Sequence, residues 1–97
     1  MEFSADSELN IVRDKLRVLG EDISYTMNLV SKGDPQFAQK KFQIRQLHYE
    51  LLPITEKYAG ACGDYVRSTD SDALRKRLRL MHERIEKLRT KLNLQAV

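Results

Sequence analysis

The thiol of Cys62 is the most reactive side chain in the sequence, and it belongs to the chain's one cysteine. A thiol becomes a nucleophile when a neighbouring base, most often histidine, removes its proton. His48 precedes Cys62 by 14 residues, about four helical turns, which places it beyond hydrogen-bond reach if both lie on one helix. His82 stands in a separate stretch of sequence. We therefore expect Cys62 to be a small packed residue.

Other residue groups with chemical potential also lack their necessary companions. The two histidines have no nearby ligand pair, which argues against a zinc site. Asp70-Ser71-Asp72 is similar to the start of a calcium loop, but the remaining ligands and the glycine are missing, so helix capping is the expected role. Gly60-Ala61-Cys62-Gly63 has no lysine-serine pair after it and no strand before it, unlike a phosphate loop. We expect no catalytic, cofactor or metal site, and no enzyme activity.

The elements that position these residues follow from apolar spacing. Apolar residues recur at alternating intervals of three and four, the a and d positions of a heptad, and such a seam drives left-handed supercoiling. The first run is Leu9, Val12, Leu16, Leu19, Ile23, Thr26 and Val30. The second run is Ile44, Leu47, Leu51, Ile54, Tyr58, Ala61 and Tyr65, with Phe37 one heptad earlier. The third run is Leu74, Leu78, Met81, Ile85, Leu88 and Leu92.

Turn residues separate the three runs. The first turn is Gly33-Asp34-Pro35. Glycine tolerates the left-handed conformation that often follows a helix, aspartate can cap the next helix, and proline suits a first helical turn. Thr69-Asp70-Ser71-Asp72 supplies cap oxygens and first-turn acids. We therefore predict helices over about 5–32, 35–68 and 71–94 in a single domain of residues 1–97. Because short connections make sequential helices antiparallel, the expected fold is all-α, an antiparallel three-helix left-handed coiled-coil bundle.

The second run contains residues that disfavour a helix. Pro53 removes a backbone donor, and Gly60 and Gly63 each cost about 1 kcal/mol relative to alanine. We favour one kinked helix because the heptad phase continues to Tyr65, whereas the alternative ends the helix near Ala59. The heptads also leave open whether one chain folds on itself or helices pair between chains, as in dimeric or domain-swapped coiled coils.

The core is expected at heptad positions from all three runs. The residues predicted to form it are Leu16, Leu19, Ile23, Leu47, Leu51, Ile54, Leu78, Met81, Ile85 and Leu88.

With these features the chain resembles a spectrin repeat, the three-helix unit of spectrins, actinins, dystrophin relatives, nesprins and plakins. The run from Leu78 to Leu88, LRLMHERIEKL, is similar to the family's leucine-x-x-leucine-asparagine-glutamate-arginine-tryptophan-x-x-leucine. His48, followed by Glu50, Leu51 and Ile54, is similar to a common stretch of the family's second helix. The chain departs from the family in having no tryptophan, and Ile85 stands where the last helix usually carries one.

The resemblance implies a structural and protein-interaction module of a cytoskeletal or scaffold protein. Such repeats occur in tandem, so adjacent repeats are expected partners, together with actin or other cytoskeletal proteins. The implied location is cytoplasmic and cytoskeleton-associated. A lone cysteine agrees with a reducing compartment, and the sequence lacks both a signal-peptide pattern and an apolar run of the roughly 20 residues that a membrane span needs.

Charge suggests where partners would bind. Between Ala73 and Leu92 eight basic residues stand against two acidic ones, a local net charge of +6 in a chain of +3. We favour a solvated face whose charges meet acids on a neighbouring helix, as in many coiled coils; the alternative is attraction of an acidic filament or anionic lipid. The candidate partner-binding residues are Lys40, Lys41, Arg75, Lys76 and Arg79.

Two other function classes remain open at this point. The basic third helix also fits a small nucleic-acid-binding bundle, although the sequence has no helix-turn-helix pattern and no aromatic-basic cluster. A three-helix adaptor, such as a chaperone-binding or vesicle-fusion regulatory domain, would share the same shape, since fold alone does not select a function.

Overall fold

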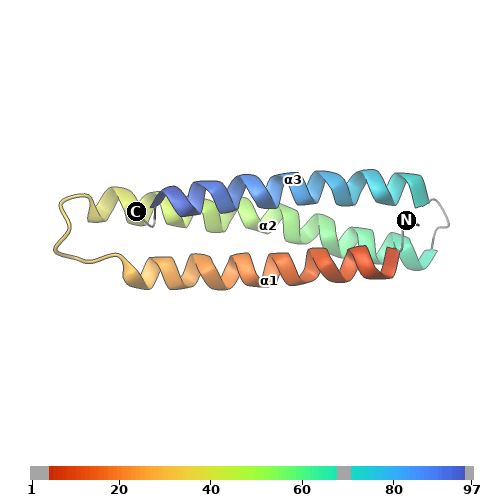
Figure 1. The fold of residues 1–97 in the computed structure, drawn as a ribbon, viewed down its shortest axis with the longest axis horizontal. Helices are drawn as coiled ribbons and strands as arrows, with labels where there is room; N and C mark the ends of the chain where they lie inside the picture. Colours follow the sequence, from red (N-terminus) through yellow and green to blue (C-terminus); the bar gives the residue numbers. More distant parts are fainter. Residues whose placement is uncertain (1–4, 68–70, 96–97) are drawn as a thin grey trace.

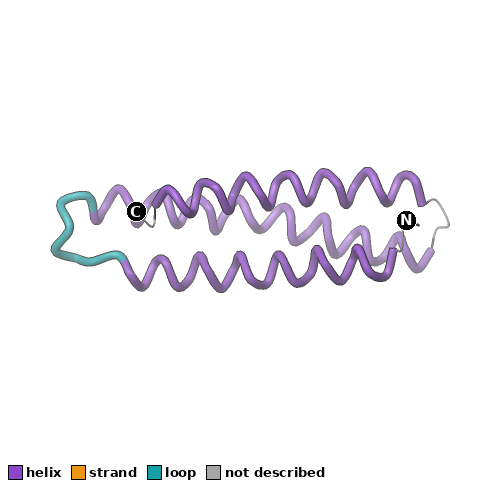
Figure 2. Tube along the Cα trace, viewed as in Figure 1, coloured by secondary structure: helices purple, strands orange, loops and turns teal. Residues whose placement is uncertain are grey.

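A computed structural model describes residues 5–67 and 71–95, which form three helices packed against one another. Helix α1 spans Ala5–Leu29, α2 spans Phe37–Arg67 and α3 spans Ser71–Gln95. The helices lie side by side along one long axis (Figure 1), and a loop connects α1 to α2 (Figure 2). The molecule measures 53 × 24 × 16 Å, so it is a short rod. No helix in these ranges is long and apolar enough to cross a lipid bilayer.

The chain runs along the rod in α1, returns in α2 and runs outward again in α3 (Figure 1). Side-chain contacts agree with this path. Near the start of α1, Asp6 forms a hydrogen bond with Tyr65 near the end of α2, and Gly20 of α1 faces Leu51 at the middle of α2. Each helix contacts both of the others.

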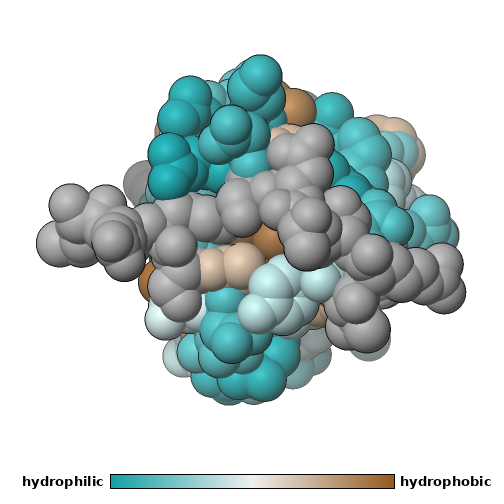
Figure 3. Space-filling view, turned by 90° about the vertical axis from the view of Figure 1, so that its right-hand side faces the viewer, coloured by the Kyte–Doolittle hydropathy of each residue, from teal (hydrophilic) through white to brown (hydrophobic). Residues whose placement is uncertain are grey.

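The core follows the heptad positions of all three helices. Every residue of the expected core is buried, and two of them, Leu19 and Ile85, have no exposed surface. The other buried side chains are Leu9, Val12, Thr26, Ile44, Ala61, Leu74 and Leu92. An end-on view shows hydrophilic residues over most of the outer surface at this end, with hydrophobic residues visible near the middle (Figure 3). Apolar burial, worth about 1.5–3 kcal/mol for each large side chain, is thus spread along the rod.

Helix α1 ends at Leu29, three residues before the expected end at Lys32. Val30 still packs against the core although it lies outside the helix. The prediction that Gly33 adopts a left-handed conformation after the helix is wrong, because Gly33 does not have a positive φ. Its N–H instead donates to the hydroxyl of Ser31 at 3.2 Å. The loop after α1 is therefore stabilised by a serine hydroxyl that accepts a backbone N–H, and not by a glycine in the left-handed conformation.

Helix α2 begins at Phe37, two residues after the expected start at Pro35. Asp34 caps it as predicted: its Oδ1 accepts from the Gln36 N–H at 2.7 Å, and its backbone carbonyl accepts from Phe37 at 3.0 Å. Its other carboxylate oxygen accepts from Lys40 Nζ at 3.0 Å. The hydrogen bond from Gln36, followed by the one from Lys40, holds the Asp34 pKa below its usual range.

Helix α2 continues through Pro53, Gly60 and Gly63, so the alternative with a loop after Ala59 is wrong. Proline costs about 3 kcal/mol in a helix interior. Leu51 and Ile54, on either side of Pro53, are both buried, and their burial gains about 1.5–3 kcal/mol each. Tertiary packing therefore outweighs the local preference. Asp70 and Thr69, predicted to cap α3, lie outside the described residues, whereas Asp72 stands in its first turn.

Candidate functional site

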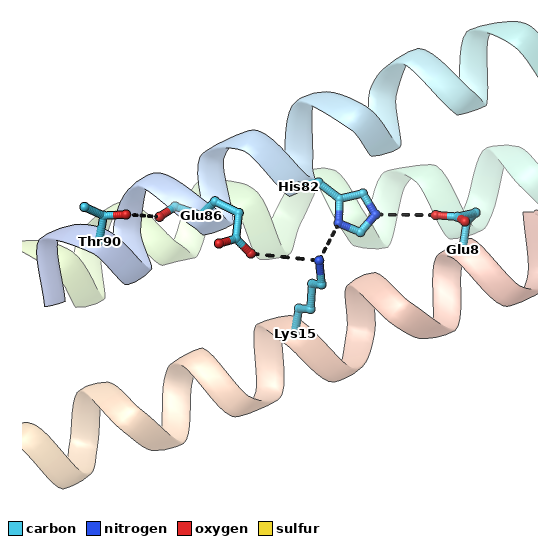
Figure 4. Close-up of polar contacts among 5 residues, drawn as sticks. All are labelled: Glu8, Lys15, His82, Glu86 and Thr90. Atoms are coloured by element: carbon cyan, nitrogen blue, oxygen red, sulfur yellow. Dashed lines mark hydrogen bonds and ion pairs between the residues drawn. The ribbon is translucent and has the colours of Figure 1, made fainter. Parts of the chain in front are cut away.

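The side chains considered for catalysis remain apart in the structure. His48 is exposed and packs edge-on against Tyr49, with ring centroids 6.3 Å apart. His82 points from α3 toward α1 (Figure 4), whereas Cys62 is half-buried against the core. Within residues 5–67 and 71–95, no three His, Cys, Asp or Glu side chains are placed to hold a metal ion.

Cys62 forms a hydrogen bond with the phenol of Tyr58, one turn earlier on α2. Burial raises the Tyr58 pKa above its usual value, and the hydrogen bond with Cys62 raises it further. Tyr65, one heptad later, has an exposed fraction of 38%, and its hydrogen bond with Asp6 raises its pKa as well. Both phenols therefore stay protonated at neutral pH. Tyr58 packs against the core, whereas Tyr65 is exposed and forms its hydrogen bond with Asp6 across the α1–α2 boundary.

A polar network that the sequence analysis did not identify joins α1 to α3 (Figure 4). His82 lies at its centre. Its Nε2 is 3.5 Å from Glu8 Oε2, and its Nδ1 is 3.3 Å from Lys15 Nζ. Lys15 also reaches Glu86 Oε1 at 3.9 Å, and the Thr90 hydroxyl donates to the Glu86 carbonyl at 3.0 Å. Because an ammonium only donates, Nδ1 must accept, which leaves Nε2 to carry the proton that faces Glu8.

The network links α1 to α3 through partly exposed side chains. The side chains of Glu8, Lys15 and His82 are 24–38% exposed, and the exposed ion pair between Lys15 and Glu86 is worth about 0–1 kcal/mol. Glu8 and Lys15 directly precede the core a positions Leu9 and Leu16, and His82 directly follows the d position Met81. Such flanking g and e positions commonly pair between coiled-coil helices, so the heptads contained the signal for this network.

The basic residues of α3 partly pair with α2. Arg77 forms an ion pair with Asp64, and Lys91 Nζ lies 3.5 Å from Glu50 Oε2. The Arg77 guanidinium also lies 3.5 Å from where a Cβ on Gly60 would stand. These contacts match the arrangement favoured from the sequence, in which the basic face meets acids on a neighbouring helix.

The five candidate partner-binding residues lie at two different ends of the rod. Arg75, Lys76 and Arg79 are exposed near the start of α3, whereas Lys40 and Lys41 stand near the start of α2, at the opposite end (Figure 1). Lys40 pairs with Asp34, and the Lys41 ammonium lies 5.4 Å from the centre of the Phe37 ring. The structure thus brings the three α3 residues together and separates them from the two lysines.

Comparison with models of known protein families, with curated proteins and with solved structures finds no match to this chain. The three-helix, all-helical bundle is compatible with a spectrin-like repeat, and membership of that family stays a prediction.

Proposed function

We propose that this chain is a spectrin-like structural and protein-interaction module that serves as a rod spacer and docking surface in a cytoskeletal or scaffold protein of the cytoplasm. The observation that carries the proposal is the core: residues from Leu9 to Leu92 form one buried apolar cluster shared by all three helices. Because this core extends along a rod 53 Å long, the domain suits a spacer that separates its neighbours and bears mechanical load.

The proposed arrangement is an antiparallel, left-handed coiled coil. The alternating three- and four-residue spacing supports it, since the mean interval of 3.5 residues keeps a seam in contact only if the helices wind around each other with a left-handed twist. The ion pairs of Arg77 with Asp64 and of Lys91 with Glu50 suit this geometry, because e and g positions flank such seams.

The proposed docking surface is the start of α3, where Arg75, Lys76 and Arg79 are exposed. A cluster of three cations attracts an acidic protein surface, and the actin filament is the partner implied by the resemblance. Lys40 and Lys41 form a separate contact site at the other end of the rod, where local interactions with Asp34 and Phe37 already engage them.

Cosedimentation with actin filaments tests the docking role. We expect the chain to pellet with filaments at low ionic strength, and to lose binding on Arg75→Glu with Arg79→Glu. The matched control is Arg45→Glu, an exposed cation on α2. Binding that ignores salt, or that survives the double reversal, would contradict docking through this surface.

Stretching single molecules between two handles tests the rod role. The described helices and loops span residues 5–95, whose extended length is roughly 3.4 Å per residue, so unfolding should add about 250 Å to the folded rod. One reversible step of that size is the expected result. Unfolding in separate helix-sized steps would contradict a shared load-bearing core.

A further inference from the structure

Helix α1 carries a second apolar surface in addition to its core face. Ile11, Val18, Tyr25 and Leu29 follow one another at intervals of seven, seven and four, and they lie within an arc of about 40° on the helix. Ile11 is 42% exposed, Tyr25 64% and Leu29 60%, and Val18 is half-buried. We call these four residues the α1 stripe. An exposed row of large apolar side chains this long is typical of a contact surface.

Acidic residues flank the α1 stripe. Asp14 and Asp22 lie on either side of it, between its apolar members. Asp22 has no ion-pair partner among the described residues, and Asp14 pairs only with its exposed neighbour Arg13 at 3.6 Å. The one nearby lysine, Lys15, is directed to His82 and Glu86 on α3. The stripe therefore presents apolar groups with negative charge beside them.

Along the boundary of α2 and α3, apolar groups lie beside positive charge. Two hollows of about 250 and 200 Å³ lie there, and they adjoin each other because Glu50 and Lys91 line both. Their apolar lining includes Leu47, Pro53, Ile54, Leu88 and Leu94. Leu94 is 70% exposed. We call this surface the α2–α3 groove.

Cations rim the α2–α3 groove. Arg84 and Lys87 line it and have no ion-pair partner in the described part of the chain, whereas Lys91 is already paired with Glu50. On the same face of α3, Leu80 and Leu94 are 14 residues apart with Lys87 midway, an apolar–cation–apolar pattern. Ile11 and Tyr25 of the stripe are also 14 residues apart, so both patterns extend about 21 Å along a helix.

We propose that the α1 stripe of one copy of this chain docks into the α2–α3 groove of a second copy. Stripe against stripe would face acid with acid, and groove against groove would face cation with cation. Only stripe against groove brings opposite charges together. Because the two surfaces lie on different helices, the contact is heterologous, and it continues head to tail from one copy to the next.

The contact is weak and depends on salt. A single helix face buries less than the roughly 1,600 Å² of a standard interface, and its charges lie at the solvent-exposed rim. This inference does not depend on actin docking, because the groove uses none of the residues proposed for that role.

Sedimentation equilibrium of the chain over a wide concentration range provides the first test. We expect the average mass to rise with concentration at an ionic strength of about 0.01 M, and to fall toward that of a monomer at about 1 M, where the Debye length shortens from about 30 Å to about 3 Å. A monomer at every concentration and both ionic strengths would overturn the proposal and leave the proposed rod function standing.

Charge swaps identify the two surfaces. Asp14→Lys with Asp22→Lys reverses the stripe, and Arg84→Glu with Lys87→Glu reverses the groove; each pair should abolish self-association at low salt. The chain with all four substitutions keeps the net charge of +3, and it should associate again because the surfaces remain complementary. Arg45→Glu, an exposed reversal outside both surfaces, should leave association unchanged.

Two outcomes of these swaps would overturn the docking mode. Association that persists in either double variant would show that the contact lies elsewhere. A four-substitution chain that stays monomeric while retaining its helical circular dichroism would show that stripe and groove do not meet. Mixing the two double variants gives an independent check, because each supplies the surface that the other one needs.

Discussion

Ile85 shows how much of the stability depends on single side chains in the core. It is fully buried on α3, at the position where the resemblance would place a tryptophan. Replacing it by alanine should lower the free energy of unfolding by about 2–5 kcal/mol, since both transfer and cavity terms are lost. Urea unfolding measures the change. Leu80→Ala on the same helix is the control, because Leu80 is 53% exposed and its truncation should cost much less.

Gly63 is a residue whose replacement should stabilise the protein. It lies within α2 without a positive φ, and a Cβ added there would meet no atom within 4 Å. Gly63→Ala should therefore raise the free energy of unfolding by about 0.5–1 kcal/mol, because alanine loses less backbone entropy in a helix. Gly33→Ala, in the loop, should gain less. A thermal melt that leaves Gly63→Ala at or below the wild-type midpoint would argue against a continuous α2.

At the scale of elements, the α1–α2 loop depends on the ionised form of Asp34. Its folded-state pKa is lowered from 3.8, so its stabilising contribution is fully present above about pH 4 and is lost as the pH falls through the lowered value. Asp34→Asn keeps an oxygen for the Gln36 N–H but removes the charge that pairs with Lys40. We expect the variant to melt below wild type at pH 7, and the difference to shrink as the pH falls through the lowered pKa of Asp34.

Melting curves across this pH range give the comparison. Glu56→Gln is the matched control, since Glu56 is exposed on α2 and has no ion-pair partner among the described residues. A constant difference between Asp34→Asn and wild type from pH 7 to pH 2 would mean that the charge of Asp34 does not contribute.

The same elements show how far sequence predicts the fold. Heptad spacing predicted the buried positions of all three helices, because the burial of apolar side chains makes a large favourable contribution to the free energy of folding. The end of α1 could not be located to the residue, because Val30 keeps its core contact in a non-helical conformation. The α1–α3 network was missed because it requires knowing which g and e positions face each other across helices. The sequence shows which residues are basic but not which of them lie together. The fold places the start of α2, which carries Lys40, and the start of α3, which carries Arg75, at opposite ends of the rod.

At the scale of the whole molecule, the rod follows from the helix lengths. Helices of 25, 31 and 25 residues are about 38, 47 and 38 Å long at 1.5 Å per residue. The core face of each helix runs along the length of that helix. The helices therefore pack side by side along one axis, and their length sets the length of the rod. The radius of gyration is accordingly 15.8 Å, compared with about 13 Å for a compact protein of 100 residues.

Small-angle X-ray scattering at high salt and low concentration tests this shape, because those conditions suppress association between copies. We expect a monomeric mass and a radius of gyration near the 15.8 Å of the rod. The Ile85→Ala variant, studied well below its melting temperature, should keep the same radius, since a single cavity does not change how the helices pack. A dimeric mass with a larger radius under these conditions would mean that the heptads pair between chains, and the single-chain rod would be wrong.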